Sequence, residues 1–459
     1  MGGHVHVAGV AGVGMSALAQ ALRWTHERVT GSDRFLDQGQ DLPVFGALRA
    51  AGIELVPQDG SAVSARTAAV VYSTAIEADN PDFAAAQRHG VPLRHRAAVL
   101  AELAQGRTVL AVAGTAGKTT TTGMLGWTLA ELGADPTVVN GGALVDWADA
   151  AHVGNVRRGG EQAPWVIEVD ESDRSLLNFR PAWSILTNIS QDHFTLAEVQ
   201  ELFRQYAAQV QTGMVCGAGV GDVLGPQAAK IVEATARPEA TPEGCAVVWR
   251  GQELVVRQPG AHNALNALLA AELCAQLGHE PARIAEALAR FGGIQRRLER
   301  VDRGGPVRVV DDYGHNPAKL AAAWRAVSAP GRRVLGAWRP HGFGPLRSML
   351  EPLAEAFASV CRKDDRLWLL PVYDAGGTAD RSITSAALAE KLKARGVNVD
   401  LAADYEALGA ALVRAARPGD TLLVMGARDP RLPGFARELA VRTAGNPPAA
   451  AARRERKDP

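Results

Sequence analysis

The chain has 459 residues, a formal net charge of +0, 47% hydrophobic residues and 21% charged residues. This balanced charge argues against a nucleic-acid scaffold and against electrostatic attachment to a membrane. The length is too great for one hydrophobic core, so we expect two to four domains. We expect neither a membrane span nor a signal peptide, and the four scattered cysteines fit a reducing cytoplasm.

The first glycine-rich turn lies close to the start of the chain. Val5 to Ala8 is typical of a buried strand, and Met15, Leu18 and Leu22 predict a helix after it. The glycines between them follow the order G-x-x-G-x-G, a turn that can hold a pyrophosphate at the helix N-terminus. Asp33 falls where the acid of a Rossmann fold meets a ribose. Simple packing glycines and a nicotinamide site remain alternatives.

A second buried strand is predicted over 69–76, and Asn80-Pro81 caps the helix that follows it. Strands therefore alternate with helices through the first third of the chain. This alternation predicts a parallel α/β domain.

The most informative stretch is a strand, a glycine loop and a helix around residues 108–133. The loop reads Gly114-Thr115-Ala116-Gly117-Lys118-Thr119-Thr120. Glycines let backbone N–H groups approach phosphate oxygens, Lys118 supplies a point charge, and the hydroxyl of Thr119 can bind Mg²⁺. The strict P-loop pattern has a glycine where this chain has Val112, so we predict a shorter variant. The alternative is a packing turn with a chance lysine.

Acidic residues follow the next buried strand, which is predicted over 165–169. Glu168 and the cluster from Asp170 to Asp173 stand where α/β sheets place their ligands, so a carboxylate here can hold Mg²⁺. A solvated acidic loop is the alternative. A further strand over 183–189 is followed by Asp192 and His193, and His193 is either a second metal ligand or a hydrogen-bonding histidine.

The remaining sequence supplies a second sheet and several polar turns. Leu265, Leu269, Leu273 and Leu277 predict an amphipathic helix, whose first turn carries amides that either face a nucleoside or cap the helix. No chemistry is assigned to 213–260, where we predict two short strands. After residue 299, four strands alternate with helices, and three of their exits carry polar clusters. Parallel strands would bring these clusters to one ligand face, and ordinary polar loops are the alternative.

Taken in chain order, these motifs resemble the Mur ligase family of peptidoglycan synthesis. The resemblance implies an α/β protein of three domains: a Rossmann-like domain for the UDP substrate at 1–105, a P-loop-type ATPase domain at 106–298 and a Rossmann-like domain for the amino acid at 299–445. A disordered tail is expected at 446–459. The motifs run from the glycine turn through the phosphate loop and the acidic cluster to Asp311-Asp312-Tyr313-Gly314-His315 and Pro340-His341.

The resemblance also implies an activity. The branch of the family that fits best joins L-alanine to the carboxylate of UDP-N-acetylmuramate, with ATP and Mg²⁺, through an acyl phosphate. Such a cytoplasmic ligase serves cell wall biogenesis, cell shape and cell division. It would act on small molecules as a monomer or homodimer, without nucleic-acid or membrane partners.

Carried over by position, the resemblance assigns roles to individual residues. The catalytic set is Lys118, Glu168, His193, Arg297 and His341. The ATP contacts are Gly114, Thr115, Gly117, Lys118, Thr119, Thr120, Asn266, Arg297 and Asp312. The contacts to the other substrates are Gly12, Gly14, Ser73, Thr74, Tyr313, His315 and His341, and the metal ligands are Thr119, Glu168 and His193.

Two departures from the family pattern bear on this expectation. Ala116 replaces the usual histidine or asparagine of the loop, and Gly342 replaces an arginine expected to bind the incoming carboxylate. Arg347 or Arg339 could substitute for that cation. Gly342 keeps open a sister ligase with another acceptor, such as a tripeptide-recycling enzyme, and Ala116 keeps open a nucleotide-binding regulator without catalysis.

Overall fold

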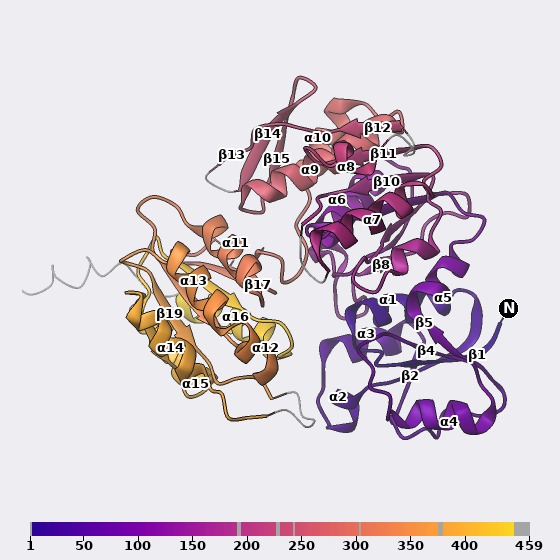
Figure 1. Cartoon of the computed structure of the whole chain (residues 1–459), viewed down its shortest axis with the longest axis horizontal. Helices are drawn as coiled ribbons and strands as arrows, with labels where there is room; N and C mark the ends of the chain where they lie inside the picture. The colour runs from indigo at the N-terminus through magenta and orange to yellow at the C-terminus, as the bar shows by residue number, and fades with distance from the viewer. Residues whose placement is uncertain are drawn as a thin grey trace, which may run out of the picture. The chain divides into compact units, whose positions relative to one another are not determined.

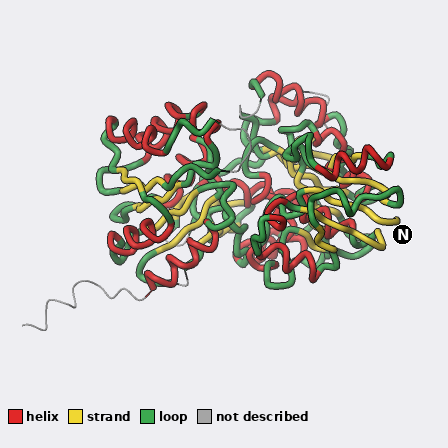
Figure 2. Tube along the Cα trace, turned by 90° about the horizontal axis from the view of Figure 1, so that it is seen from below, coloured by secondary structure: helices red, strands yellow, loops and turns green. Residues whose placement is uncertain are grey.

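The computed structural model describes residues 2–190, 194–225, 230–241, 244–302, 304–374 and 380–444. The chain forms two compact units, one of Met1–Arg257 with Ala261–Ile294 and one of Gln258–Gly260 with Gln295–Pro459. Each unit is built from mainly parallel sheets covered by helices (Figures 1 and 2). This arrangement confirms the predicted α/β class.

The first unit begins with a five-stranded parallel sheet in the order β3-β2-β1-β4-β5. Its strands are β1 Gly2–Ala8, β2 His26–Ser32, β3 Glu54–Val56, β4 Thr67–Tyr72 and β5 Leu93–His95. The helices of this part are α1 Val13–Leu22, α2 Arg34–Asp37, α3 Pro43–Ala50, α4 Pro81–His89 and α5 Arg96–Leu103. Asn80 caps α4 by accepting a hydrogen bond from the backbone of Asp82, as predicted.

The first unit also holds a seven-stranded sheet in the order β12-β11-β10-β6-β9-β7-β8, and only its edge strand β8 is antiparallel to its neighbour within the described residues. Its strands are β6 Val109–Ala113, β7 Thr137–Val139, β8 Val156–Arg157, β9 Trp165–Glu168, β10 Trp183–Leu186, β11 Gly213–Cys216 and β12 Lys230–Glu233. The main helices are α6 Lys118–Glu131, α7 Leu196–Ala207, α9 Ala261–Gln276 and α10 Pro281–Ala289.

The stretch 213–260 contains more structure than its sequence indicated. The two predicted strands are observed as β14 Cys245–Trp249 and β15 Gln252–Val256, which form a small antiparallel sheet with β13 Glu239–Ala240. In addition, β11 and β12 extend the large sheet in parallel register. We missed these two because four-residue strands carry little periodicity of their own.

The second unit holds a six-stranded sheet in the order β16-β17-β21-β18-β19-β20, in which β16 is antiparallel to β17. Its strands are β16 Glu299–Arg300, β17 Arg308–Asp312, β18 Val334–Trp338, β19 Arg366–Leu369, β20 Val399–Leu401 and β21 Thr421–Met425. Its helices are α11 Pro317–Val327, α12 Phe343–Ser348, α13 Leu350–Val360, α14 Ser385–Ala394, α15 Tyr405–Ala415 and α16 Leu432–Ala444. The four predicted strands are confirmed, and β16 and β20 are additions.

Apolar side chains fill the space between the sheets and the helices. Every residue of β6 is buried, as expected for a strand covered on both faces. The leucine stripe of α9 is only partly buried, because Leu269 and Leu273 lie in the core whereas Leu265 is 39% exposed. Steps of four residues rotate by about 40° each around a helix, so the four leucines spread over about 120° of its surface and Leu265 lies at one edge of that arc.

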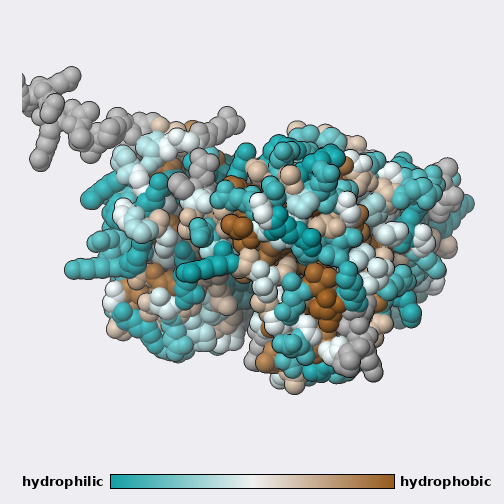
Figure 3. Space-filling model, turned by 90° about the horizontal axis from the view of Figure 1, so that it is seen from above, coloured by the Kyte–Doolittle hydropathy of each residue, from teal (hydrophilic) through white to brown (hydrophobic). Residues whose placement is uncertain are grey.

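The surface differs clearly from this interior. The face in Figure 3 is mostly hydrophilic, with separate apolar patches. Among the described residues, no helix is both long and apolar enough to cross a membrane.

Candidate active site

The phosphate loop joins the buried strand β6 to helix α6, as the sequence predicted. Val112 is fully buried within β6, so the position of the missing glycine belongs to the strand and the loop begins later. Gly114 and Gly117 have φ angles of 131° and 83°. A Cβ on Gly114 would lie 2.0 Å from Oγ1 of Thr187, and one on Gly117 would lie 2.6 Å from Oδ1 of Asn266. Glycine is therefore needed at both ends of the loop.

The residues after β10 hold this loop from one side. Thr187 Oγ1 donates to the carbonyl of Ala116 at 2.6 Å, and Asn188 Nδ2 donates to the same oxygen at 2.9 Å. Asn188 Oδ1 accepts from the backbone N–H of Ala116 at 3.0 Å and from Thr115 Oγ1 at 2.6 Å. The loop is thus held through the backbone of residue 116, so alanine there loses none of these contacts. Sequence reasoning had not placed either side chain in the site.

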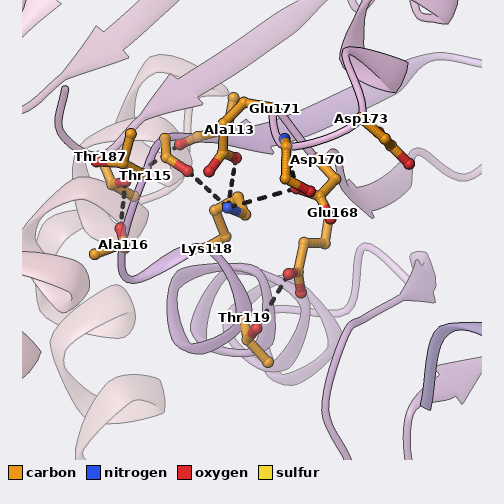
Figure 4. A network of polar contacts seen from close by, with 12 residues as sticks. Ala113, Thr115, Ala116, Lys118, Thr119, Glu168, Asp170, Glu171, Asp173 and Thr187 are labelled. Carbon is orange, nitrogen blue, oxygen red and sulfur yellow. Dashed lines mark hydrogen bonds and ion pairs between the residues drawn. The ribbon is translucent and has the colours of Figure 1, made fainter. Parts of the chain in front are cut away.

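Lys118 begins α6, and its ammonium lies among carboxylates (Figure 4). Nζ donates to the carbonyl of Gly114 at 2.8 Å and to Oε2 of Glu171 at 2.5 Å, and lies 4.0 Å from Asp170 Oδ1. Burial opposes the charged form, but the carboxylates outweigh it and raise the pKa of Lys118. Burial also raises the pKa of Glu171, although Lys118 opposes that shift.

Thr119 and Glu168, the predicted metal ligands, lie next to one another. Thr119 Oγ1 is 3.1 Å from Glu168 Oε1, and the N–H of Gly141 donates to Glu168 Oε2 at 2.7 Å. Two neighbouring ligands of an octahedral Mg²⁺ at about 2.1 Å would be separated by about 3 Å, so this oxygen pair fits such an ion. No group of three or more potential His, Cys, Asp or Glu ligands occurs in the described parts of the chain. The pair therefore suits a metal that takes its other ligands from phosphate and water.

Other members of the predicted ATP site are distributed as follows. Thr115 in the loop and Thr120 in the first turn of α6 are buried, and Asn266 of α9 lies next to Gly117. Asp192 and His193 lie outside the described residues.

The N-terminal glycine turn is also formed as expected. Gly12 precedes α1, which has no side-chain cap. Asp33 accepts from the N–H groups of Ala11 at 2.9 Å and of Phe35 at 3.0 Å, so its carboxylate closes this turn and caps α2. Ser73 and Thr74 follow β4, whose neighbour in the sheet is β1. Parallel strands bring the ends of both to the same edge as the turn.

Two contacts tie this turn to the part of the same unit that carries the phosphate loop. The buried amide of Asn155 donates to the carbonyl of Val13 at 2.7 Å and accepts from Gln20 at 3.1 Å. Arg96 packs against Gly14, and its guanidinium lies 3.4 Å from Oδ2 of Asp170. Asp170 therefore lies near two cations, Lys118 of the phosphate loop and Arg96 of α5.

In the second unit, a pair of arginines stands near the exit of β17. Arg296 and Arg297 lie over the ring of Tyr313, at 4.9 Å and 5.4 Å from its centroid. Asp312 accepts from the N–H groups of Leu298 at 2.9 Å and Gly314 at 2.7 Å, and burial raises its pKa although Arg297 opposes the shift. Asp312 and Arg297 thus belong to this unit, whereas Asn266 belongs to the first.

The predicted amino-acid contacts are brought together here. The ring of His315 lies 5.7 Å from that of Tyr313 and 5.2 Å from that of His341, measured between centroids. Burial, followed by the nearby His315 and Arg428, lowers the pKa of His341 to about 4. His341 is therefore neutral at pH 7.

Gly342 directly precedes α12. Its φ of 158° and ψ of 157° disfavour a side chain, so an arginine would need a backbone shift here. Both suggested replacements already have carboxylate partners. Arg347 lies 2.8 Å from Asp380, and Arg339 pairs with Asp429.

Three profiles of one protein family match three successive segments of the chain. The profile of the "Mur ligase family, catalytic domain" matches residues 4–108, that of the "Mur ligase middle domain" matches 112–207, and that of the "Mur ligase, glutamate ligase domain" matches 296–428. The UDP-N-acetylmuramate–L-alanine ligase of Gloeobacter violaceus is 34% identical over 449 residues, covering 92% of each chain. That of Stenotrophomonas maltophilia is 35% identical over 461 residues, covering 93% of this chain and 92% of its own.

Solved structures share the architecture. The UDP-N-acetylmuramate-alanine ligase of Thermotoga maritima superposes with a TM-score of 0.78 at 24% identity, covering 96% of this chain and 98% of its own. A murein peptide ligase from Psychrobacter arcticus superposes with a TM-score of 0.66 at 20% identity, covering 96% of this chain and 99% of its own. The resemblance predicted from the motifs is confirmed: this chain belongs to the Mur ligase family.

Proposed function

We propose that this protein is an ATP-dependent ligase that joins L-alanine to the carboxylate of UDP-N-acetylmuramate in peptidoglycan precursor synthesis. The observation that carries the proposal is similarity along nearly the whole chain, at 34% and 35% identity, to ligases of that name. The phosphate loop supports it, since Lys118, Thr119 and Glu168 converge there. The family uses ATP, and this loop is the part of the chain suited to bind it.

The chemistry must convert a carboxylate into a reactive acyl group. A carboxylate oxygen attacks the γ-phosphorus of ATP, the bond to ADP breaks, and an acyl phosphate forms. The amine of L-alanine then attacks the acyl carbon, inorganic phosphate leaves, and loss of a proton gives the amide. In this proposal Lys118 and Arg297 neutralise the charge that spreads over the transferring phosphoryl group.

Thr119 and Glu168 would hold Mg²⁺, whose charge stabilises phosphate oxygens when it is bound. His193, outside the described residues, is proposed as the ligand of a second metal ion. Gly141 keeps Glu168 in place by donating its N–H to the second carboxylate oxygen. Its lack of a side chain is required, since a Cβ would lie 2.4 Å from Glu168 Oε2.

The remaining assignments follow the three-domain division at 1–105, 106–298 and 299–445. We assign Gly12, Gly14, Ser73 and Thr74 to the diphosphate of the UDP substrate. Asn266 and Asp312 are assigned to the nucleoside of ATP. Tyr313, His315 and His341 are assigned to the incoming amino acid, and the neutral state of His341 suits it to accept or donate a hydrogen bond there.

Purified protein supplied with ATP, Mg²⁺, UDP-N-acetylmuramate and one amino acid at a time tests the proposal. We expect ADP release that depends on the sugar nucleotide and is fastest with L-alanine, together with an amide product detected by mass spectrometry. Absence of ADP and product with every amino acid would refute the assignment.

A second candidate is a ligase that attaches a peptide, such as the tripeptide of cell wall recycling. Gly342 favours it, because the chain lacks at this position the arginine expected to bind a small amino acid's carboxylate. L-alanine and the tripeptide competing in one assay would separate the two candidates. A clear preference for L-alanine removes the second.

A further inference from the structure

The carboxylates at the end of β9 and in the turn after it face different partners (Figure 4). Glu168 faces Thr119 and Gly141, on the side assigned to the metal. Glu171 instead bonds to Lys118 at 2.5 Å. The metal-side carboxylate thus ends β9, and the lysine-side carboxylate stands in the turn that follows it.

The bond from Glu171 fixes the lysine from a buried position. The side chain of Glu171 is 5% exposed and that of Lys118 is 14% exposed, so neither charge is well solvated. An ammonium group has three N–H donors. Within the described residues, the hydrogen bonds of Nζ go to Gly114 and Glu171, and the third donor remains for a phosphate oxygen.

We propose that Glu171 is a positioning residue, which orients the ammonium of Lys118 for phosphoryl transfer and weakens nucleotide binding in doing so. Orientation raises the rate because a fixed donor need not reorganise when charge develops on the transferring group. The cost to binding arises because a buried negative charge beside Lys118 repels the triphosphate. The expected effect of Glu171 on the rate rests on the proposed ligase function. Its expected effect on affinity rests only on ATP binding.

Two substitutions separate the charge of Glu171 from its position. Glu171→Gln keeps the size and an acceptor oxygen but removes the charge, so we expect the Kd for a non-hydrolysable ATP analogue with Mg²⁺ to fall roughly threefold to tenfold. Its kcat should fall about tenfold. Glu171→Asp keeps the charge but is one methylene shorter, so kcat should fall about tenfold while Kd stays within about twofold of the original.

A matched control is available on α9. Glu272 is a buried carboxylate that pairs with Arg250 at 2.7 Å and also accepts from Trp249. Glu272→Gln removes the charge of an equally buried carboxylate, 7% exposed, whose partner Arg250 is 47% exposed and does not belong to the phosphate loop. We expect it to lower the melting temperature without changing Kd or kcat.

Calorimetric titration gives Kd and steady-state ADP release gives kcat for all four proteins. A Kd for Glu171→Gln equal to or above that of the original protein, or an unchanged kcat in both Glu171 variants, overturns the proposal. If Glu171→Gln fails to fold, an unchanged kcat in Glu171→Asp still overturns it. If the original protein binds the analogue but makes no amide with any acceptor, the proposed function fails, and the Kd comparison still decides the effect of Glu171 on binding.

Discussion

The phosphate loop of the first unit and the histidine cluster of the second unit both lie at the ends of parallel strands, yet they are held differently. The loop is fixed by backbone conformation, since Gly114 and Gly117 adopt positive φ and Ala116 is held through its peptide groups. The cluster of Tyr313, His315 and His341 is held by ring contacts between side chains. A site fixed through its backbone tolerates a change such as Ala116, whereas a site built from side chains changes with each substitution.

Removal of the loop cation should give the largest effect. Lys118→Ala leaves the phosphates without their point charge, so we expect kcat/KM for ATP to fall by about 10³-fold or more. Lys230→Ala is the matched control, because Lys230 lies in β12 and bonds to Gln276 at 2.9 Å, apart from the loop. A Lys118→Ala protein that retains more than about a tenth of the activity would contradict the role given to this residue.

Removal of the carboxylate charge next to Thr119 should give the second-largest loss of activity. Glu168→Gln keeps the size of the side chain but takes away the charge that attracts a divalent cation. We expect activity to fall about 100-fold and the half-saturating Mg²⁺ concentration to rise. Magnesium titration of ADP release measures both quantities. A fall in activity with an unchanged Mg²⁺ dependence would place the metal elsewhere.

A methyl group at Gly117 tests whether backbone geometry holds the loop. Gly117→Ala strains a φ of 83° and places Cβ 2.6 Å from Asn266, so we expect it to reduce the free energy of unfolding by about 2–3 kcal/mol. Gly133 also has a φ of 83°, but its Cβ would meet no atom within 4 Å. Gly133→Ala should therefore cost only about 1 kcal/mol. Equal costs in chemical denaturation would show that crowding by Asn266 is unimportant.

Protonation of the histidine cluster should give the smallest effect. The pKa of His341 is lowered to about 4 from an ordinary value of 6.5, so between these values the unfolded chain binds more protons there than the folded protein. The stabilisation that the neutral His341 gives the folded protein is fully present above pH 6.5 and is lost as the pH falls toward 4. We expect a loss of roughly 1–2 kcal/mol after solvent screening. In His341→Asn, the free energy of unfolding should change less between pH 6.5 and 4 than in the original protein. An unchanged pH dependence would contradict the lowered pKa of His341.

Much of the candidate site was predictable because it depends on local sequence. The strand, loop and helix around Lys118 form a continuous segment, and Glu168 is the last residue of the buried strand β9. The positions of Glu171, Thr187 and Asn188 were not predictable as loop contacts, because these residues are 53 to 73 positions away from their loop partners, as in Lys118–Glu171 and Thr115–Asn188. Hydrophobic periodicity in the sequence does not indicate which carboxylate of an acidic cluster will face a lysine.

The sequence by itself determined the α/β class, the phosphate loop and the family, since hydrophobic periodicity and glycine placement act over a few residues. Only the tertiary structure decided that Glu168 faces Thr119 while Glu171 faces Lys118. It also decided that Arg339 pairs with Asp429 instead of remaining an unpaired cation. The reason is that burial and charge pairing depend on side chains from distant segments, which meet only when the sheets assemble.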